Sequence, residues 1–233
     1  GIPAVSDWQR ARSAAYFHYT SNETIHGVEF PDVPEIGDVP LVADFSSNFL
    51  SRPVDVSRFG RMYAGAQKNL GPAGITIAVI RKDLLGRHGR DLPPIFEWQN
   101  QVKNDSMFNT PPTFPWYVVG LVLKWMIAEG GLPVFAARNA EKSALLYSAI
   151  DASGGFYRNE VAISARSTMN VPFMLKDEVL DKAFLKESEA AGLLGLKGNR
   201  ALGGMRASIY NAMPLQGVQS LVDFMNDFAV RNG

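Results

Sequence analysis

A long apolar stretch with a single charge is the feature that most restricts how this chain folds. Between Met62 and Ile80 the only charged side chain is Lys68, which is set among alanines, glycines and β-branched residues. Burying an ammonium group costs several kcal/mol unless other groups compensate for the lost water. The lysine therefore either lies at an exposed turn or has a chemical role.

The residues around Lys68 predict a strand, a turn and a second strand. Residues 63–66 are typical of a strand end, Gly-Pro-Ala-Gly at 71–74 is typical of a turn, and 75–80 predict a fully buried strand. A lysine in this connection lies near a low-dielectric interior, which lowers its pKa and makes the neutral amine available as a nucleophile. Most lysines are solvated surface groups, so the context and not the residue type favours a Schiff-base role.

Composition excludes several classes of function. The 233 residues have a formal net charge of zero and no cluster of basic residues, so we expect neither nucleic acid nor a membrane as partner. The absence of cysteine excludes disulfides, thiolate catalysis and cysteine-based zinc sites. The longest apolar run, 116–123, is shorter than the roughly 18 residues of a membrane span. The absence of cysteine also fits the cytoplasmic location that we expect. The three histidines lack metal-ligand spacing, so we expect no metal site.

The remaining pattern predicts a large α/β domain followed by a small α+β domain. Apolar strands come first, two helical segments follow, and short strands and helices then alternate, at 14–20, 41–47, 114–129, 132–150, 168–175, 178–191, 205–210 and 214–230. Dense apolar strands are typical of the interior of a large α/β domain. We therefore expect a large domain over 1–130, a bridging helix over 131–155 and a small domain over 156–233.

Asp44 lies at the carboxyl end of the predicted strand 41–47, where open α/β sheets bind ligands. If a pyridine-ring cofactor were bound as an imine to Lys68, this carboxylate would keep the ring nitrogen protonated. Such a charge pair is worth about 4 kcal/mol at contact in an effective dielectric of about 20. A protonated ring stabilises a carbanion. Without Lys68, Asp44 would be interpreted as a turn or cap residue.

Four blocks of sequence then carry a resemblance to a known family. They are SNETIHGVEF at 21–30, the run from ADFSS to RKDLLG at 43–86, SMFNTPPTFPWY at 106–117 and GGMRASIYNAMP at 203–214. Together they resemble the phosphoserine aminotransferases, pyridoxal 5'-phosphate enzymes of the aspartate-aminotransferase fold (fold type I). The resemblance implies amino transfer between glutamate and 3-phosphohydroxypyruvate, giving phosphoserine and 2-oxoglutarate in serine biosynthesis. Bacterial members often accept a second phosphorylated substrate of pyridoxine biosynthesis.

The resemblance also implies roles for residues that would surround the cofactor. Lys68 looks like the Schiff-base lysine and catalytic base, and Asp44 like the partner of the pyridine nitrogen. Thr24 is similar to a contact near the ring hydroxyl, and Gln67 to a contact near the phosphate. Judged only as sequence, Thr24 and Gln67 are equally well explained as polar loop residues.

Further residues implied by the resemblance would bind the phosphate groups. Asn109 and Thr110 reach the cofactor phosphate of the other subunit in the family, which makes the active sites of a homodimer shared, although Asn-Thr-Pro-Pro is also a good turn. Arg200 and Arg206 suit a substrate with a carboxylate and a phosphate, and surface salt bridges are the alternative explanation. Asn199 stands where the family usually has histidine, and it can donate a hydrogen bond but carries no charge.

Family chains are longer at the amino end by about a half-domain, on the usual scale of 100 to 200 residues per domain. That part supplies a phosphate-binding turn, an aromatic ring over the cofactor and an arginine for the substrate carboxylate. We therefore expect a large domain that is incomplete at its N-terminus and either a separate N-terminal fragment as partner or a truncated chain. Two alternatives stay open: another fold type I aminotransferase or lyase, which would not need Arg200 and Arg206, and a non-catalytic fragment that acts only as a dimer scaffold.

Overall fold

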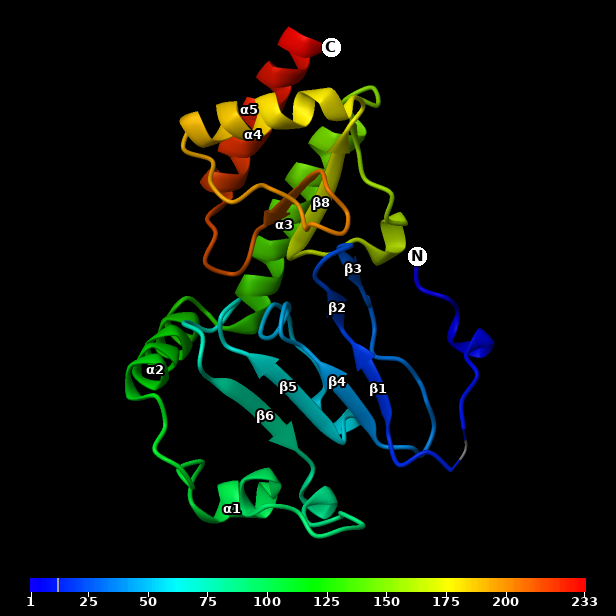
Figure 1. Cartoon of the computed structure of the whole chain (residues 1–233), viewed down its shortest axis with the longest axis vertical. Coiled ribbons are helices and arrows are strands. Elements are labelled where there is room, and N and C mark those ends of the chain that lie inside the picture. Colours follow the sequence, from blue (N-terminus) through cyan, green and yellow to red (C-terminus); the bar gives the residue numbers. More distant parts are fainter. Residues whose placement is uncertain (12) are drawn as a thin grey trace.

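The computed structural model describes residues 1–11 and 13–233 (Figure 1). The apolar side chains of these residues form two buried clusters. One cluster belongs to the sheet of the N-terminal half. The other lies among the helices and strands of the C-terminal part. The long helix α3 (Leu132–Asp151) runs from the first region to the second.

The larger sheet has four strands in the order β1-β4-β5-β6. The strands β1 (Phe17–Thr20), β4 (Leu41–Asp44) and β5 (Arg61–Gly65) are parallel, whereas β6 (Thr76–Ile80) runs antiparallel to β5. Parallel strands have their carboxyl ends at one edge of the sheet. The residues that follow β1, β4 and β5 therefore meet at that edge.

Alternation along β4 and β5 separates a core face from a face that carries polar groups. Leu41, Ala43, Met62 and Ala64 are buried in the N-terminal cluster. The intervening residues, among them Asp44, are only half-buried. The strand thus places a carboxylate on the sheet face opposite the apolar core.

The prediction of a fully buried strand at 75–80 is wrong. Every residue of β6 is half-buried or exposed, and Val79 is 40% exposed. The reason is topological, because among residues 1–11 and 13–233 β6 stands at the end of the strand order and pairs only with β5. Its apolar sequence resembles that of an interior strand, and sequence alone does not distinguish the two positions.

Two short strands, β2 (Asn22–Glu23) and β3 (Val28–Glu29), form a hairpin beyond the carboxyl end of β1. After β6 the chain forms α1 (Trp98–Lys103) and α2 (Thr113–Ala128), and Figure 1 shows both outside the sheet. Only Val119 and Met126 of α2 are fully buried. Several large apolar side chains of α2 are exposed, namely Phe114, Trp116, Tyr117, Leu121, Trp125 and Ile127.

No single helix among residues 1–11 and 13–233 is long and apolar enough to cross a membrane. By length and composition, α2 and α3 pass the same test as a pair, but they meet at a bend of 88°.

The C-terminal part is a three-stranded antiparallel sheet covered by helices, as the α+β pattern predicts. The strands β7 (Tyr157–Arg158), β8 (Asn170–Leu175) and β9 (Met205–Ser208) pack with α3, α4 (Asp181–Ala190) and α5 (Leu215–Asn232). Phe184 lies at the centre of this core, with edge-to-face contacts to Tyr157, Phe173, Phe224 and Phe228. The regular elements are completed by short 3-10 turns at Val5–Asp7, Val56–Arg58, Lys82–Leu84, Pro94–Phe96, Ile163–Ala165 and Glu178–Leu180.

Candidate active site

Lys68 lies in the turn after β5, at the carboxyl edge of the sheet, and its side chain is half-buried. Its Nζ atom donates a hydrogen bond of 2.8 Å to Oγ1 of Thr24, in the turn of the β2–β3 hairpin. Burial lowers the pKa of Lys68, and Arg206 lowers it further, whereas Asp44 and Glu23 act in the opposite direction. The direction of this pKa shift is the one expected for a lysine held near the low-dielectric interior of the sheet.

The local sequence explains how the chain presents Lys68. The carbonyl oxygen of Ala66 accepts hydrogen bonds from the backbone N–H groups of Leu70 and Gly71, both at 2.9 Å, which closes a tight turn around Lys68. Gly71 has a φ angle of 147°, which side-chain-bearing residues rarely adopt. The apolar residues on either side anchor the turn, and Leu70 is completely buried.

Gln67 is exposed, and its side chain folds over the backbone of Gly65. A Cβ atom on Gly65 would lie 2.6 Å from Oε1 of Gln67, closer than real contacts allow. The glycine thus leaves room for the amide group of Gln67 beside the end of β5.

Asp44 lies at the end of β4, opposite Tyr63 of β5. Its Oδ1 atom accepts a hydrogen bond of 2.7 Å from the backbone N–H of Ser46, which orients the carboxylate. The hydroxyl of Tyr63 lies 2.9 Å from Nε2 of His18, and burial and the Asp44 carboxylate both raise the pKa of Tyr63. Asp44 therefore belongs to a polar group on the sheet face, close enough to Lys68 to influence its pKa.

Arg206 reaches the same hairpin from β9. Its Nη1 atom lies 3.5 Å from the carbonyl oxygen of Thr24, and its buried Nε atom has no hydrogen-bond partner among the residues that the structure describes. Lys68 and Arg206 thus approach Thr24 from two parts of the chain that are 138 residues apart (206 − 68). Two cationic groups at one place suit an anionic ligand.

The remaining predicted site residues form no hydrogen bond with Lys68 in the part of the chain that the structure describes. Asn199 and Arg200 lie in the loop between α4 and β9, where Oδ1 of Asn199 accepts a hydrogen bond from the backbone N–H of Ala201 at 2.9 Å and Arg200 is exposed. Asn109 and Thr110 are both exposed in the segment between α1 and α2. In Figure 1 that segment lies beyond β6, the strand farthest from β1.

The comparison with known families concerns almost the whole chain. The model of the class-V aminotransferases matches residues 4–221. The chain belongs to the class-V aminotransferase family. It is 61% identical to a phosphoserine aminotransferase of Stenotrophomonas maltophilia (strain K279a), and the match covers 100% of this chain and 64% of that protein. It is 58% identical to the enzyme named phosphoserine aminotransferase in Xanthomonas campestris pv. campestris (strain 8004), again over 64% of its length.

Solved structures agree with this assignment. The phosphoserine aminotransferase from Bacillus circulans subsp. alkalophilus superimposes with a TM-score of 0.97 at 48% identity, over 100% of this chain and 64% of that one. A PLP-bound phosphoserine aminotransferase from Trichomonas vaginalis gives a TM-score of 0.91 at 42% identity, over 97% and 64%. The predicted aspartate-aminotransferase-like fold is confirmed. The chain spans about 64% of the length of the relatives it matches.

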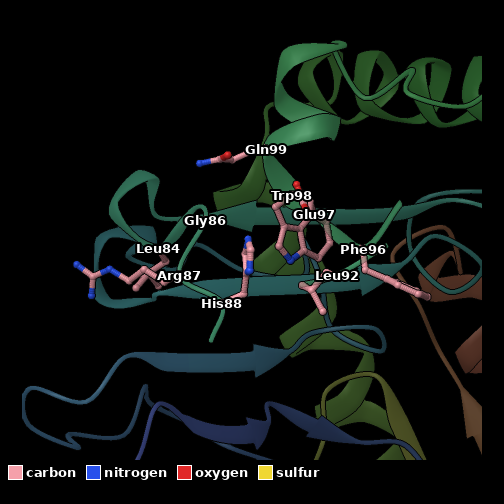
Figure 2. A pocket seen from close by; sticks show the side chains of 9 residues that line it. All are labelled: Leu84, Gly86, Arg87, His88, Leu92, Phe96, Glu97, Trp98 and Gln99. Atoms are coloured by element: carbon pink, nitrogen blue, oxygen red, sulfur yellow. The ribbon is translucent and has the colours of Figure 1, made fainter. Parts of the chain in front are cut away.

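Two cavities of this class-V aminotransferase chain lie outside the cluster around Lys68. Figure 2 shows one of about 200 Å³ beside α1, lined by Leu84, Gly86, Arg87, His88, Leu92, Phe96, Glu97, Trp98 and Gln99. It contains none of the predicted site residues. The other, of about 280 Å³, is bordered by His26 of the β2–β3 hairpin and by Leu202. The loop that carries Asn199 and Arg200 therefore faces the hairpin that carries Thr24.

The sequence reasoning missed a set of buried asparagines behind the site. Asn22, next to the hairpin turn, donates hydrogen bonds of 2.8 Å to Oγ of Ser47 and to Oδ1 of Asn170 in β8. Asn170 in turn donates to the hydroxyl of Tyr210 at 3.1 Å. The available signal was an uncharged polar residue inside an apolar block, as Asn170 is in MNVPFML at 169–175. No group of three or more His, Cys, Asp or Glu suited to a metal ion occurs in residues 1–11 and 13–233.

Proposed function

We propose that this chain carries the Schiff-base lysine and the substrate arginine of a phosphoserine aminotransferase. The enzyme would transfer an amino group between glutamate and 3-phosphohydroxypyruvate, with pyridoxal 5'-phosphate as cofactor, in L-serine biosynthesis. The observation that carries the proposal is the position of the Lys68 amine, which lies at Thr24 together with the Arg206 guanidinium. Burial lowers the pKa of this amine. The similarity over the whole chain to enzymes of that name supports it.

The residues around Lys68 fit this cofactor. When bound, pyridoxal 5'-phosphate supplies an electron-accepting ring that stabilises negative charge on the α-carbon of the substrate. Asp44, on the sheet face, would hold a proton on a ring nitrogen, and the Thr24 hydroxyl accepts a hydrogen bond from Lys68. The Lys68 amine would hold the cofactor at its aldehyde group and, once the amino group of the substrate has replaced it there, the freed amine would move the α-proton as general base and acid. Gln67, at the exposed end of the turn, would contact the phosphate.

Arg206 is the proposed anchor for the anionic substrate. Its half-buried guanidinium lies beside Thr24, where its positive charge would attract a carboxylate or phosphate. Arg200 is exposed and would provide a second cation, with Asn199 as a neutral donor in place of the usual histidine. A second phosphorylated substrate of pyridoxine biosynthesis would use the same arginines.

The proposal includes a homodimer with shared active sites. Asn109 and Thr110 are exposed in the segment between α1 and α2, and by analogy with the family they would serve the cofactor phosphate of a second copy. The large apolar side chains exposed on α2 support a covered interface there. A separate N-terminal fragment is a further proposed partner. The proposed substrates are glutamate and 3-phosphohydroxypyruvate. The proposed location is the cytoplasm, which agrees with the cysteine-free composition. The division into 1–130, 131–155 and 156–233 is proposed as the domain organisation.

The direct test is the variant Lys68→Ala. The unchanged chain, mixed with pyridoxal 5'-phosphate and reduced with borohydride, should retain a pyridoxyl group on the peptide that contains Lys68, as detected by mass spectrometry. Lys68→Ala should lose that label, and the matched variant Lys82→Ala should keep it, because Lys82 is exposed in the 3-10 turn after β6. If Lys68→Ala carried as much pyridoxyl label as the unchanged chain, now on other lysines, the assignment would be refuted.

Activity distinguishes the proposal from its alternatives. Amino transfer is measured with the chain alone and after mixing with a polypeptide that covers the remaining part of the Stenotrophomonas maltophilia relative. A preference for 3-phosphohydroxypyruvate over hydroxypyruvate that disappears in Arg206→Gln supports a phosphoserine aminotransferase. Equal use of both substrates favours another aminotransferase or lyase of the same fold, and labelling without any turnover in either mixture favours a scaffold.

A further inference from the structure

Lys142 is a buried cation outside the site described above. Its side chain is 1% exposed, and Nζ donates hydrogen bonds of 2.9 Å and 2.8 Å to the carbonyl oxygens of Ile209 and Tyr210. Among the described residues Lys142 forms no ion pair with a carboxylate. The charged group that influences its pKa is Arg138, which lowers it. A buried ammonium without a counter-charge is a poor way to stabilise a fold. Its contacts therefore point to a different task, which is to hold the segment after β9.

Asn139 lies one helical turn before Lys142 on the same face of α3. Its Nδ2 atom donates hydrogen bonds to the carbonyl oxygen of Ser51 at 3.0 Å and to Oδ1 of Asn211 at 2.8 Å. Asn211 donates from Nδ2 to the carbonyl oxygen of Leu50 at 3.0 Å. Leu50 has a φ angle of 55°, a left-handed conformation that a bulky residue adopts only when its surroundings impose it. Asn139 and Asn211 thus hold a strained backbone in place.

Asn211 also holds the residue next to the candidate Schiff-base lysine. Its backbone N–H donates to Oδ1 of Asn69 at 3.0 Å, and Nδ2 of Asn69 donates to the carbonyl oxygen of Phe49 at 3.0 Å. Asn69 directly follows Lys68 and is 7% exposed. We call the four side chains of Asn69, Asn139, Lys142 and Asn211 the polar junction.

The polar junction connects the two backbone segments that carry the cations at Thr24. On one side it holds the turn that carries Lys68, and on the other it holds Ile209, three residues after Arg206 on the same segment. Neither cation is fixed by an ion pair to a carboxylate among the described residues, so their separation depends on how their backbones are held. Lys68 and Arg206 repel each other, which makes the pKa of Lys68 sensitive to that separation.

We propose that the polar junction sets the position of the Lys68 amine relative to the Arg206 guanidinium, and that Asn139 and Lys142 act as positioning residues through it. The inference rests on the proposed function only for the use of the two cations. Loosening the junction would admit water to the Lys68 turn and let the two cations separate. Both changes favour the protonated amine, so the pKa of Lys68 would rise towards its ordinary value.

The test is the variant Lys142→Met, which keeps the length of the apolar stem and removes the ammonium. The amines are labelled competitively with a trace of acetic anhydride at a series of pH values, and the label on each peptide is quantified. This measures the titration midpoint of Lys68, the pH at which its amine is half-protonated, without any cofactor. The groups that face Lys68 are Asp44, Arg206 and Glu23, and none of them is changed. We expect the midpoint to rise by about half a pH unit or more, which corresponds to about threefold less labelling at pH 7.5.

A matched control separates positioning from loss of stability. Leu146→Ala, one turn after Lys142 on α3, removes a fully buried side chain of the C-terminal cluster but no junction hydrogen bond. It should lower the melting temperature and leave the Lys68 midpoint unchanged. Asn139→Ala should raise the midpoint in the same direction, and it carries the test if Lys142→Met does not fold. Folded Lys142→Met or Asn139→Ala with the midpoint of the unchanged chain would overturn the inference, whereas failure of borohydride labelling at Lys68 would overturn only the proposed function.

Discussion

The buried cation Lys142 leads to a prediction about stability and pH. Burial, and to a smaller extent Arg138, lowers its pKa from 10.5 to about 8 in the folded protein. The unfolded chain therefore keeps the proton up to about pH 10.5, whereas the folded chain releases it near pH 8. Between these values the unfolded state binds more protons, so the free energy of unfolding should rise with pH.

The size of the effect follows from the shift. A difference of about 2.5 pH units, at about 1.4 kcal/mol per unit, corresponds to roughly 3 kcal/mol. Below pH 8 Lys142 is charged in both states and the full cost of burying the charge is present, while above pH 10.5 it is neutral in both. The free energy of unfolding of the unchanged chain minus that of Lys142→Met should thus increase by about 3 kcal/mol between pH 7.5 and pH 11.

The assay is urea denaturation followed by circular dichroism at several pH values for both chains without cofactor. Taking the difference removes the contribution of all other titrating groups. Lys182→Met, which changes an exposed lysine of α4, serves as the control and should give a difference that does not depend on pH. A difference for Lys142→Met that is flat, or that falls with rising pH, would refute the reasoning that the buried ammonium is a cost to the fold.

Three further predictions concern single side chains. Phe184→Ala should lower the free energy of unfolding by about 3 to 5 kcal/mol in urea titrations, because it empties the centre of the C-terminal core; a loss below about 1 kcal/mol would contradict that packing. Gly65→Ala should displace Gln67 and weaken the binding of pyridoxal 5'-phosphate severalfold in an absorbance titration, and unchanged affinity would argue against a phosphate contact by Gln67. Arg206→Gln should raise the pKa of Lys68 in competitive acetylation, because it removes a nearby positive charge; an unchanged or lower value would show that the two cations do not interact.

Local pattern alone predicted most of the regular structure. The helix expected at 114–129 is α2 (Thr113–Ala128), and the one expected at 132–150 is α3 (Leu132–Asp151). Such segments are predictable because the spacing of apolar residues and the flanking proline and glycine act over a few residues. The depressed pKa of Lys68 was predictable for the same reason, since it followed from a charge within an apolar stretch.

Only the tertiary structure decided what surrounds Lys68. Its hydrogen bond to Thr24 spans 44 residues, and the contact of Thr24 with Arg206 spans 182. The sequence also did not show that β6 is an edge strand, because apolar strands look alike whether they have one neighbour or two. Asn139 and Asn211, 72 residues apart, carried no visible signal of their pairing. Apolar periodicity is a local property of the chain, whereas the partner of a buried polar group is whichever distant residue the fold brings to it.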